Sequence, residues 1–375
     1  MRYAIVLTAL VACASVDEPS GLTAAGMFTE ADAAFRVFAP GYQMDFSATG
    51  LHLPEHLLVN QGAVDVLGTD LPCFESRVGV SVIPALSAHA GGGTSSEIMP
   101  ILNGPAVVKV NVTYDVDYDC PGPEKLRGET DFTLLPGGRI VREDIMVTPS
   151  SNHLDKTGSC GCQQETNPTN FHNLFFTSYW AFDPARATQV QADGSPVTED
   201  VYAACTMYPD RAIGVRWEMQ GSVGTRFHPN AAAAHVLDWV RDQTGLDATP
   251  QSITSAIQIS NTAPAAPSDC GKVLALLDDV PLQIGNTLLN LTDHDGIYRD
   301  PAVHDSAFTI TAHGSDVPPG FVISVDLGGA THARVTRSPA KAEIGVAQRE
   351  SDTRFLIAFT DGLGAGESVT IEPRR

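Results

Sequence analysis

Three features of this 375-residue sequence predict a mainly β fold. Within residues 106–118, apolar and polar side chains alternate strictly from Val108 onward, which is typical of a strand with one buried face. Gly 33 and Pro 25 are high counts, which favour many turns and short strands over long helices. Short strand-like runs recur at regular spacing in residues 271–375. Together they predict an antiparallel β-sandwich-type domain followed by a C-terminal immunoglobulin-like β-sandwich.

Residues 1–12 have the features of an export signal. A positively charged start precedes an apolar run, Tyr3 to Leu10, which is too short to cross a bilayer but suits the core of a signal peptide. The run ends in Leu10-Val11-Ala12-Cys13, which resembles the lipobox of bacterial lipoproteins. The resemblance implies that the chain is cut before Cys13, that Cys13 is lipidated, and that the protein contacts a membrane through this anchor.

The same resemblance implies a place in the bacterial cell envelope. Ala14 and Ser15 follow Cys13 with no Asp next to it, as in lipoproteins addressed to the outer membrane. The alternative is an ordinary cleaved signal at Ala12-Cys13-Ala14, which leaves a periplasmic or secreted protein. Residues 13–33 are small and polar, so we expect a flexible tether there.

Residues 34–260 predict the first β-rich domain. Its clearest part is a three-stranded antiparallel meander over residues 106–148, with a Pro136-Gly137-Gly138 turn between its last two strands. Further strands are expected at residues 175–182, 201–207 and 211–220.

One helix is predicted near residues 229–244. Pro229 stands at its start and Gly245 at its end, which is the usual asymmetry of helix termini. Val236, Trp239 and Val240 share one face at helical spacing.

Residues 261–270 contain Pro264 and Pro267 among mostly small residues, and they are predicted to be a linker to the C-terminal sandwich of residues 271–375. Seven short strands are expected there, at residues 282–291, 308–312, 321–327, 333–337, 343–347, 355–360 and 368–372. The alternative is one continuous large β-sandwich spanning both halves, as in carbohydrate lyase and mutarotase-like folds.

The net charge of the chain restricts the classes of partner that the protein can bind. Lys+Arg 23 against Asp+Glu 44 gives 23 − 44 = −21. A surface this acidic argues against nucleic acid, whose phosphates require a basic footprint. It is compatible with Ca²⁺ and with neutral or cationic ligands.

The cysteines agree with export. Seven are present, and lipidation of Cys13 leaves an even number for disulfides in an oxidising compartment. The remaining six are Cys73, Cys120, Cys160, Cys162, Cys205 and Cys270. Six cysteines allow 15 pairings, among which we favour neighbours along the chain, Cys73 with Cys120 and Cys205 with Cys270.

Two sets of residues are candidate metal ligands. His153 and His172 flank Cys160 and Cys162 in a long irregular loop, where two imidazoles and two thiolates could hold Zn²⁺ or copper, although export favours a disulfide-stapled loop. Asp293, Asp295 and Asp300 surround Gly296 and resemble the start of a Ca²⁺ loop, although the spacing departs from the EF-hand pattern and favours a tight turn.

His52-Leu53-Pro54-Glu55-His56 matches the inverted zinc-protease pattern H-x-x-E-H. That chemistry needs both histidines on one face of a continuous helix, and Pro54 would break the helix at a cost of about 3 kcal/mol. We therefore interpret the match as chance.

The sequence contains no nucleophile elbow, phosphate loop or dinucleotide fingerprint. Tyr179 and Trp180 lie in an aromatic run and are candidates for stacking on a ligand ring. We predict a lipid-anchored envelope protein with a non-enzymatic binding or structural role, its partner a glycan, surface matrix or envelope protein. The alternatives are an extracellular carbohydrate-active enzyme, a polysaccharide lyase or hydrolase, and a metal-dependent extracellular enzyme.

Overall fold

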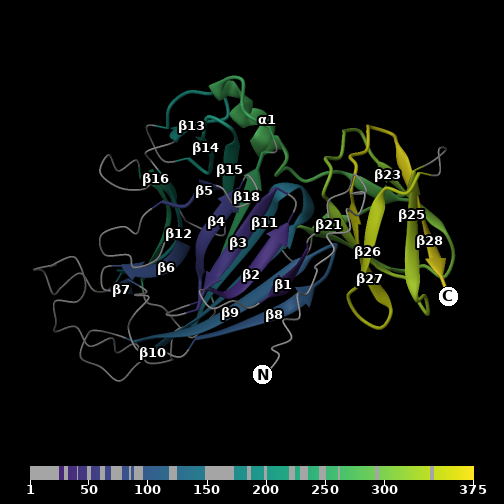
Figure 1. Ribbon diagram of the computed structural model, residues 1–375, viewed down its shortest axis with the longest axis horizontal. Coiled ribbons are helices and arrows are strands. Elements are labelled where there is room, and N and C mark those ends of the chain that lie inside the picture. Colours follow the sequence, from purple (N-terminus) through teal and green to yellow (C-terminus); the bar gives the residue numbers. More distant parts are fainter. Residues whose placement is uncertain are drawn as a thin grey trace, which may run out of the picture.

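The computed structural model describes residues 25–28, 33–39, 41–48, 52–59, 64–68, 78–83, 86–87, 96–117, 125–147, 173–183, 187–197, 201–218, 224–228, 235–244, 251–260, 262–291, 295–337 and 342–375. Within them the chain is mainly β, as predicted, and its strands form five sheets. Three sheets make an N-terminal unit and two make a C-terminal unit, which stand side by side in Figure 1.

One layer of the N-terminal unit consists of two five-stranded sheets. Sheet 1 contains β1 (Ala25–Phe28), β2 (Ala33–Ala39), β3 (Tyr42–Ser47), β4 (Pro54–Val59) and β5 (Val64–Asp65) in that order. Sheet 2 has the order β16 (Gly224–His228), β17 (His235–Thr244), β12 (Asn173–Phe182), β6 (Val78–Ile83) and β7 (Leu86–Ser87). The two sheets are joined where the amide of Gly68 donates to the carbonyl of Ala181 at 3.0 Å.

The other layer is the eight-stranded sheet 3. Its order is β13 (Thr188–Val190), β14 (Ala203–Met207), β15 (Ala212–Glu218), β18 (Gln251–Ile259), β11 (Arg139–Val147), β10 (Lys125–Leu135), β9 (Val108–Asp117) and β8 (Ser96–Asn103). The predicted meander is confirmed, since β9 pairs antiparallel with β10 and β10 with β11. The one-turn helix η1 (Pro136–Gly138) makes the predicted turn between β10 and β11.

Alternation along the strands gives sheet 3 two buried faces. Val110, Phe132 and Ile140 point into a core shared with sheets 1 and 2. Val141 and Ala256 point to the opposite face, into a second core. A sheet covered on both faces is thus the centre of the molecule.

The C-terminal unit is a sandwich of two five-stranded sheets, as predicted. Sheet 4 has the order β20 (Thr287–Leu288), β19 (Leu282–Ile284), β23 (Phe308–Ala312), β28 (Ser368–Arg374) and β25 (His332–Arg337). Sheet 5 has the order β21 (Asn290–Leu291), β22 (Ile297–Val303), β24 (Val322–Asp326), β27 (Arg354–Phe359) and β26 (Gly345–Arg349). Both contribute to one core, for example Ile310 from sheet 4 and Ile323 from sheet 5. The pair β22 and β24 is parallel, unlike the other pairs described.

The two units share an apolar interface. Ile297, Val322 and Leu356 of sheet 5 belong to the same buried cluster as Val141 of sheet 3. Gln348 adds polar contacts, because its Oε1 accepts from the amides of Ala106 and Val107 at 3.0 and 2.9 Å. The units are therefore packed together and not merely tethered.

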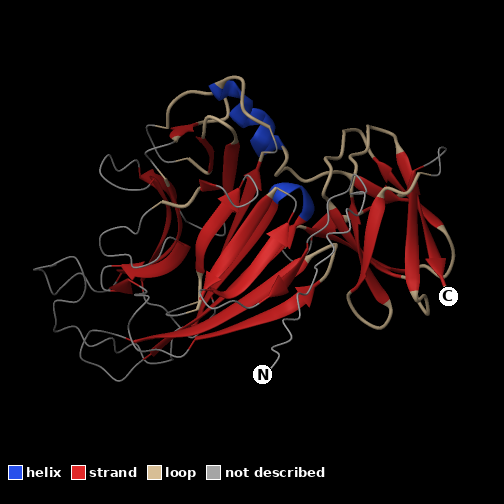
Figure 2. Ribbon diagram, viewed as in Figure 1, coloured by secondary structure: helices blue, strands red, loops and turns tan. Residues whose placement is uncertain are grey.

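The helix predicted at residues 229–244 is wrong for the part that the structure describes. Residues 235–244 form β17, which pairs with β12 along its whole length and with β16 along its first half. Hydrogen bonds to strands on both edges, together with β-branched Val236 and Val240, outweigh the helical spacing of the apolar residues. In Figure 2 the helical turns (blue) lie elsewhere.

Among its described residues the chain has one α-helix, α1 (Cys270–Ala275), which begins at the end of the predicted linker, after the turn η2 (Pro267–Asp269). Cys270, Val273, Leu274 and Leu277 are buried against sheet 3. The first three have the i, i+3, i+4 spacing of a helix with one apolar face, and Leu277 continues it in the turn that follows. No helix among the described residues is both long enough and apolar enough to cross a membrane.

Candidate functional site: a pocket between the two units

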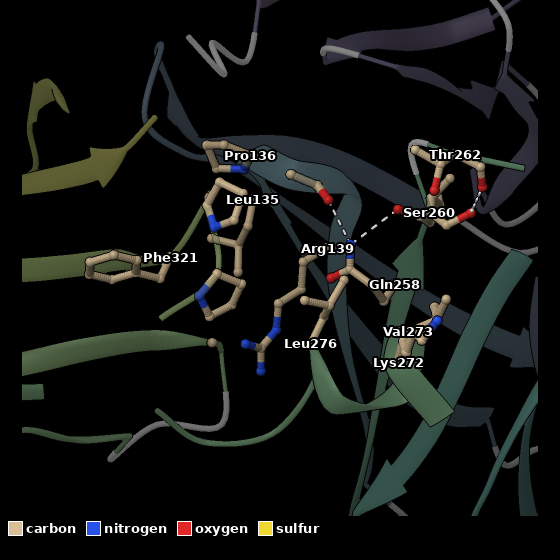
Figure 3. A pocket seen from close by; sticks show the side chains of 16 residues that line it. Leu135, Pro136, Arg139, Gln258, Ser260, Thr262, Lys272, Val273, Leu276 and Phe321 are labelled. Carbon is tan, nitrogen blue, oxygen red and sulfur yellow. Dashed lines mark hydrogen bonds between the residues drawn. The ribbon is translucent and has the colours of Figure 1, made fainter. Parts of the chain in front are cut away.

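A cavity of about 240 Å³ lies where the two units and α1 meet (Figure 3). Its walls come from the β10–β11 turn, the end of β18, α1 and the turn that precedes β24. The lining residues are Leu135, Pro136, Gly137, Arg139, Gln258, Ile259, Ser260, Thr262, Lys272, Val273, Leu276, Gly296, Pro318, Pro319, Gly320 and Phe321. Crevices between domains are common positions for ligand sites.

One wall is apolar and rigid. Phe321 stacks on Phe359 with ring centroids 4.0 Å apart. Next to it the turn of Pro318 to Gly320 touches the η1 turn so closely that a Cβ on Gly320 would lie 2.3 Å from the carbonyl oxygen of Pro136. Gly320 also has a φ of +86°, a conformation that other residues rarely adopt. Both observations explain why glycine occupies this position.

Two neutral polar side chains of the pocket, those of Gln258 and Ser260, are already hydrogen-bonded. Nε2 of Gln258 donates to the carbonyls of Gly137 at 2.6 Å and Ile259 at 3.1 Å. The hydroxyl of Ser260 donates to the carbonyl of Thr262 at 2.8 Å and accepts from the amide of Ala212 at 2.8 Å. These residues fix the shape of the pocket because their bonds hold the end of β18 against its neighbours.

Two cationic side chains complete the lining. Arg139 begins β11 and lies in the middle of Figure 3, between Phe321 on one side and Lys272 on the other. Lys272 is on α1, and its Nζ lies 2.7 Å from Oδ1 of Asp269. The ammonium of Lys272, followed by the amides of Ala266 and Ala265, lowers the pKa of Asp269 to about 2.

A disulfide holds the α1 wall in place. Cys270, the first residue of α1, is bonded to Cys205 of β14. This is one of the two pairings favoured from the sequence. Because Lys272 and Val273 follow Cys270 within the first turn of the same helix, the disulfide positions pocket residues as well as the helix itself.

A second polar cluster lies inside the N-terminal unit, between sheets 2 and 3. The Asp144 cluster consists of Tyr114, Thr130, Arg142, Asp144 and Ser178, all of them buried. Asp144 accepts from Nε of Arg142 at 2.9 Å, from the hydroxyl of Thr130 at 2.7 Å and from that of Ser178 at 2.5 Å. The Arg142 guanidinium also lies over the Trp180 ring, 5.4 Å from its centroid. A charge pair this enclosed and this fully bonded is structural in character.

Asp295 and Asp300, the candidate Ca²⁺ ligands that the structure describes, have protein partners. Both carboxylate oxygens of Asp295 bind Arg299, at 2.9 and 2.6 Å. Asp300 binds Nε2 of His304 at 2.5 Å and the amide of Ala302 at 3.0 Å. Within the described ranges, no three acidic, histidine or cysteine side chains are grouped so that they could hold a metal ion. Asp293 lies outside those ranges, so the calcium site stays a prediction.

Trp180 cannot stack on a ligand as the sequence suggested. Its side chain has 0% exposed surface. It packs edge-on against Phe132 at 6.3 Å, and its Nε1 donates to the hydroxyl of Ser255 at 3.2 Å. The indole lies on the core face of β12, which an aromatic run alone does not reveal. The side chain of Tyr179 lies outside the described residues.

The other candidate residues lie outside the described ranges. They are Cys13, Cys73, Cys120, Cys160, Cys162, His153 and His172. Their roles in lipidation, disulfides and metal binding therefore stay predictions.

The histidine motif at residues 52–56 is not helical. Pro54 begins strand β4, and His56 binds Asp65 at 2.7 Å while His52 contacts the carbonyl of Ser47 at 2.8 Å. The two histidines thus have separate partners, which agrees with a chance match.

The pocket residues themselves were not identified from the sequence. They come from five segments between residues 135 and 321, and apart from Gly296 in the Ca²⁺-loop-like stretch none of them belongs to a motif that the sequence displays. The Pro136-Gly137-Gly138 and Pro318-Pro319-Gly320 turns share a composition, but nothing in it indicates that they touch.

No family model matches the chain, and no curated protein matches it. Among solved structures, it is similar to heparinase III (the BT4657 gene product) at 7% identity and a TM-score of 0.41, over 78% of this chain and 39% of that one. It is similar to the heparan sulfate lyase HepC from Pedobacter heparinus at 8% identity and a TM-score of 0.42, over 77% and 41%. The chain thus spans about two fifths of the length of these proteins. Likenesses this weak establish neither a family nor an activity for this chain.

Proposed function

We propose that this chain is a lipid-anchored protein of the bacterial cell envelope whose described part acts by binding a ligand, without catalysing a reaction. The anchor rests on the lipobox-like residues up to Cys13. The binding role rests on the pocket between the two units.

The composition of the pocket lining carries this proposal. Among the described residues that line it there is no Asp, Glu, His, Cys or Tyr. These side chains supply most general acid–base and nucleophilic catalysis. Ser260 is a potential nucleophile, but its hydroxyl already donates to the carbonyl of Thr262 and accepts from the amide of Ala212. An apolar cavity with a few fixed polar groups is suited to recognition.

The binding role is tested with a panel of soluble polysaccharides and small acidic, neutral and basic molecules. Each is scored for binding by calorimetry and for product formation by chromatography. We expect binding without product. Turnover of any polymer would overturn the proposal in favour of a carbohydrate-active enzyme.

The anchor is tested separately, by fractionating cells that produce the wild-type chain or the Cys13→Ser variant. We expect the wild type in the membrane fraction and the variant in the soluble fraction. If the variant stays with the membrane, Cys13 is not the anchor and the lipobox interpretation is wrong. If the wild type is itself soluble, the protein is a freely secreted or periplasmic one.

A further inference from the structure

We propose that the pocket between the units binds a small molecule with one apolar ring and one carboxylate. This inference rests on the binding role proposed above and specifies the chemistry of the ligand.

The charge of the lining is opposite to that of the chain. The protein carries 44 acidic against 23 basic residues, yet the charged residues among the described part of the pocket lining are Arg139 and Lys272, both basic. A cationic pocket in an acidic molecule attracts an anion, and the surrounding negative charge keeps polyanions away. A single carboxylate meets both conditions.

Arg139 and Lys272 can each bind a ligand carboxylate in addition to their contacts within the protein. A guanidinium has five N–H donors in a planar fork, so Arg139 can keep a protein contact and still bind a carboxylate. The contact of Lys272 with Asp269 is a surface ion pair, since 83% of the lysine side chain is exposed. Asp269 does not depend on it, because its Oδ2 also accepts from the amides of Ala265 at 2.7 Å and Ala266 at 3.0 Å.

The opposite wall fits an apolar ring. Leu135, Pro136, Pro318 and Phe321 present hydrocarbon surface, and the polar groups of Gln258 and Ser260 are already bonded. The ring would lie against these side chains, next to Arg139, which stands beside Leu135 in Figure 3. A cavity of about 240 Å³ is below the ~300–1,000 Å³ of most drug-sized ligand sites. It therefore suits one ring and not an oligosaccharide.

The test uses calorimetric titration of the full mature chain with four probes. They are cyclohexanecarboxylate, the neutral cyclohexylmethanol, the cationic cyclohexylamine, and acetate, which has the charge without the ring. We expect cyclohexanecarboxylate to bind at least about tenfold more tightly than any of the other three, as a charge-assisted hydrogen bond predicts. Its affinity should fall with added NaCl.

Variants locate the site. Arg139→Gln and Lys272→Gln should each weaken the carboxylate by about fivefold or more, and Arg374→Gln, an exposed arginine outside the pocket, should leave it unchanged. Because Lys272 is exposed, we expect Lys272→Gln to fold, so its affinity for the carboxylate can be measured even if the Arg139 variant fails to fold. If the alcohol binds as tightly as the carboxylate, the binding role stands and this inference fails. If acetate binds as well, or if no probe binds, the ring carboxylate is likewise excluded.

Discussion

Asp144 shows how one buried side chain can control the stability of the N-terminal unit. It neutralises Arg142, and both side chains have 0% exposure. Asp144→Asn keeps the shape but leaves the guanidinium charge without its anion, so we expect the free energy of unfolding to fall by about 3–5 kcal/mol. Urea denaturation followed by tryptophan fluorescence measures this, because the three tryptophans, at 180, 217 and 239, all belong to the N-terminal unit. The exposed Glu97→Gln, in β8 of the same unit, is the control and should change less than about 0.5 kcal/mol. Equal effects would show that the cluster is not a stabilising unit.

At the residue scale, Asp269 also makes the stability of the fold depend on pH. Its pKa falls from 3.8 to about 2, chiefly through the hydrogen bond from Lys272 and then through the amides of Ala266 and Ala265. Since the folded pKa is the lower one, protonation favours the unfolded chain, and the contribution of Asp269 is complete above about pH 4 and lost as the pH falls toward 2. Carboxyl NMR titration should give a midpoint near 2, rising toward the usual value in Lys272→Gln. A midpoint that Lys272→Gln leaves unchanged would contradict the assigned cause.

At the scale of elements, α1 depends on the disulfide between Cys205 and Cys270. The bond closes a loop with a sequence separation of 65 residues. The chain-entropy relation gives about 4 kcal/mol for a loop of that length. The double variant Cys205→Ser/Cys270→Ser should lose up to that amount in urea denaturation. It should also bind the pocket ligand more weakly, since Val273 and Lys272 lose their anchor. Unchanged stability with unchanged binding would mean that apolar packing alone holds α1.

The strands that could be predicted from the sequence are those whose side chains alternate over a continuous stretch. The meander of β9, β10 and β11 is the best case, and β23 has the predicted bounds, Phe308–Ala312. β17 was missed because its apolar residues fit helical spacing equally well, and only its neighbours β12 and β16 decide between the two. β22 was missed because Asp300 and Pro301 interrupt its apolar pattern. In both cases the strand forms because of the strands that it pairs with, and a single sequence does not reveal that pairing.

At the scale of the whole molecule, the packing of the two units creates a pocket that local sequence patterns do not predict. The pocket exists because sheet 3 and sheet 5 pack through residues distant in the chain, such as Val141 and Val322. Each segment of the lining is unremarkable in sequence, and the site arises only where they meet. For this reason the fold class was predictable from the sequence whereas the candidate site was not.

Gly320 tests the contact between the units. Gly320→Ala would place its Cβ 2.3 Å from the carbonyl oxygen of Pro136, across the interface, whereas Gly314→Ala has nothing within 4 Å. Both glycines have positive φ, +86° and +82°, so the two variants share the backbone strain and differ in the contact. Overpacking typically costs about 1–3 kcal/mol, and we expect Gly320→Ala to lose that much more than Gly314→Ala in calorimetric unfolding. It should also weaken binding of cyclohexanecarboxylate, because Gly320 lines the pocket. If both variants lose the same amount and bind alike, the close approach of the two turns does not hold the units together, and the pocket owes its shape to the apolar interface beside it.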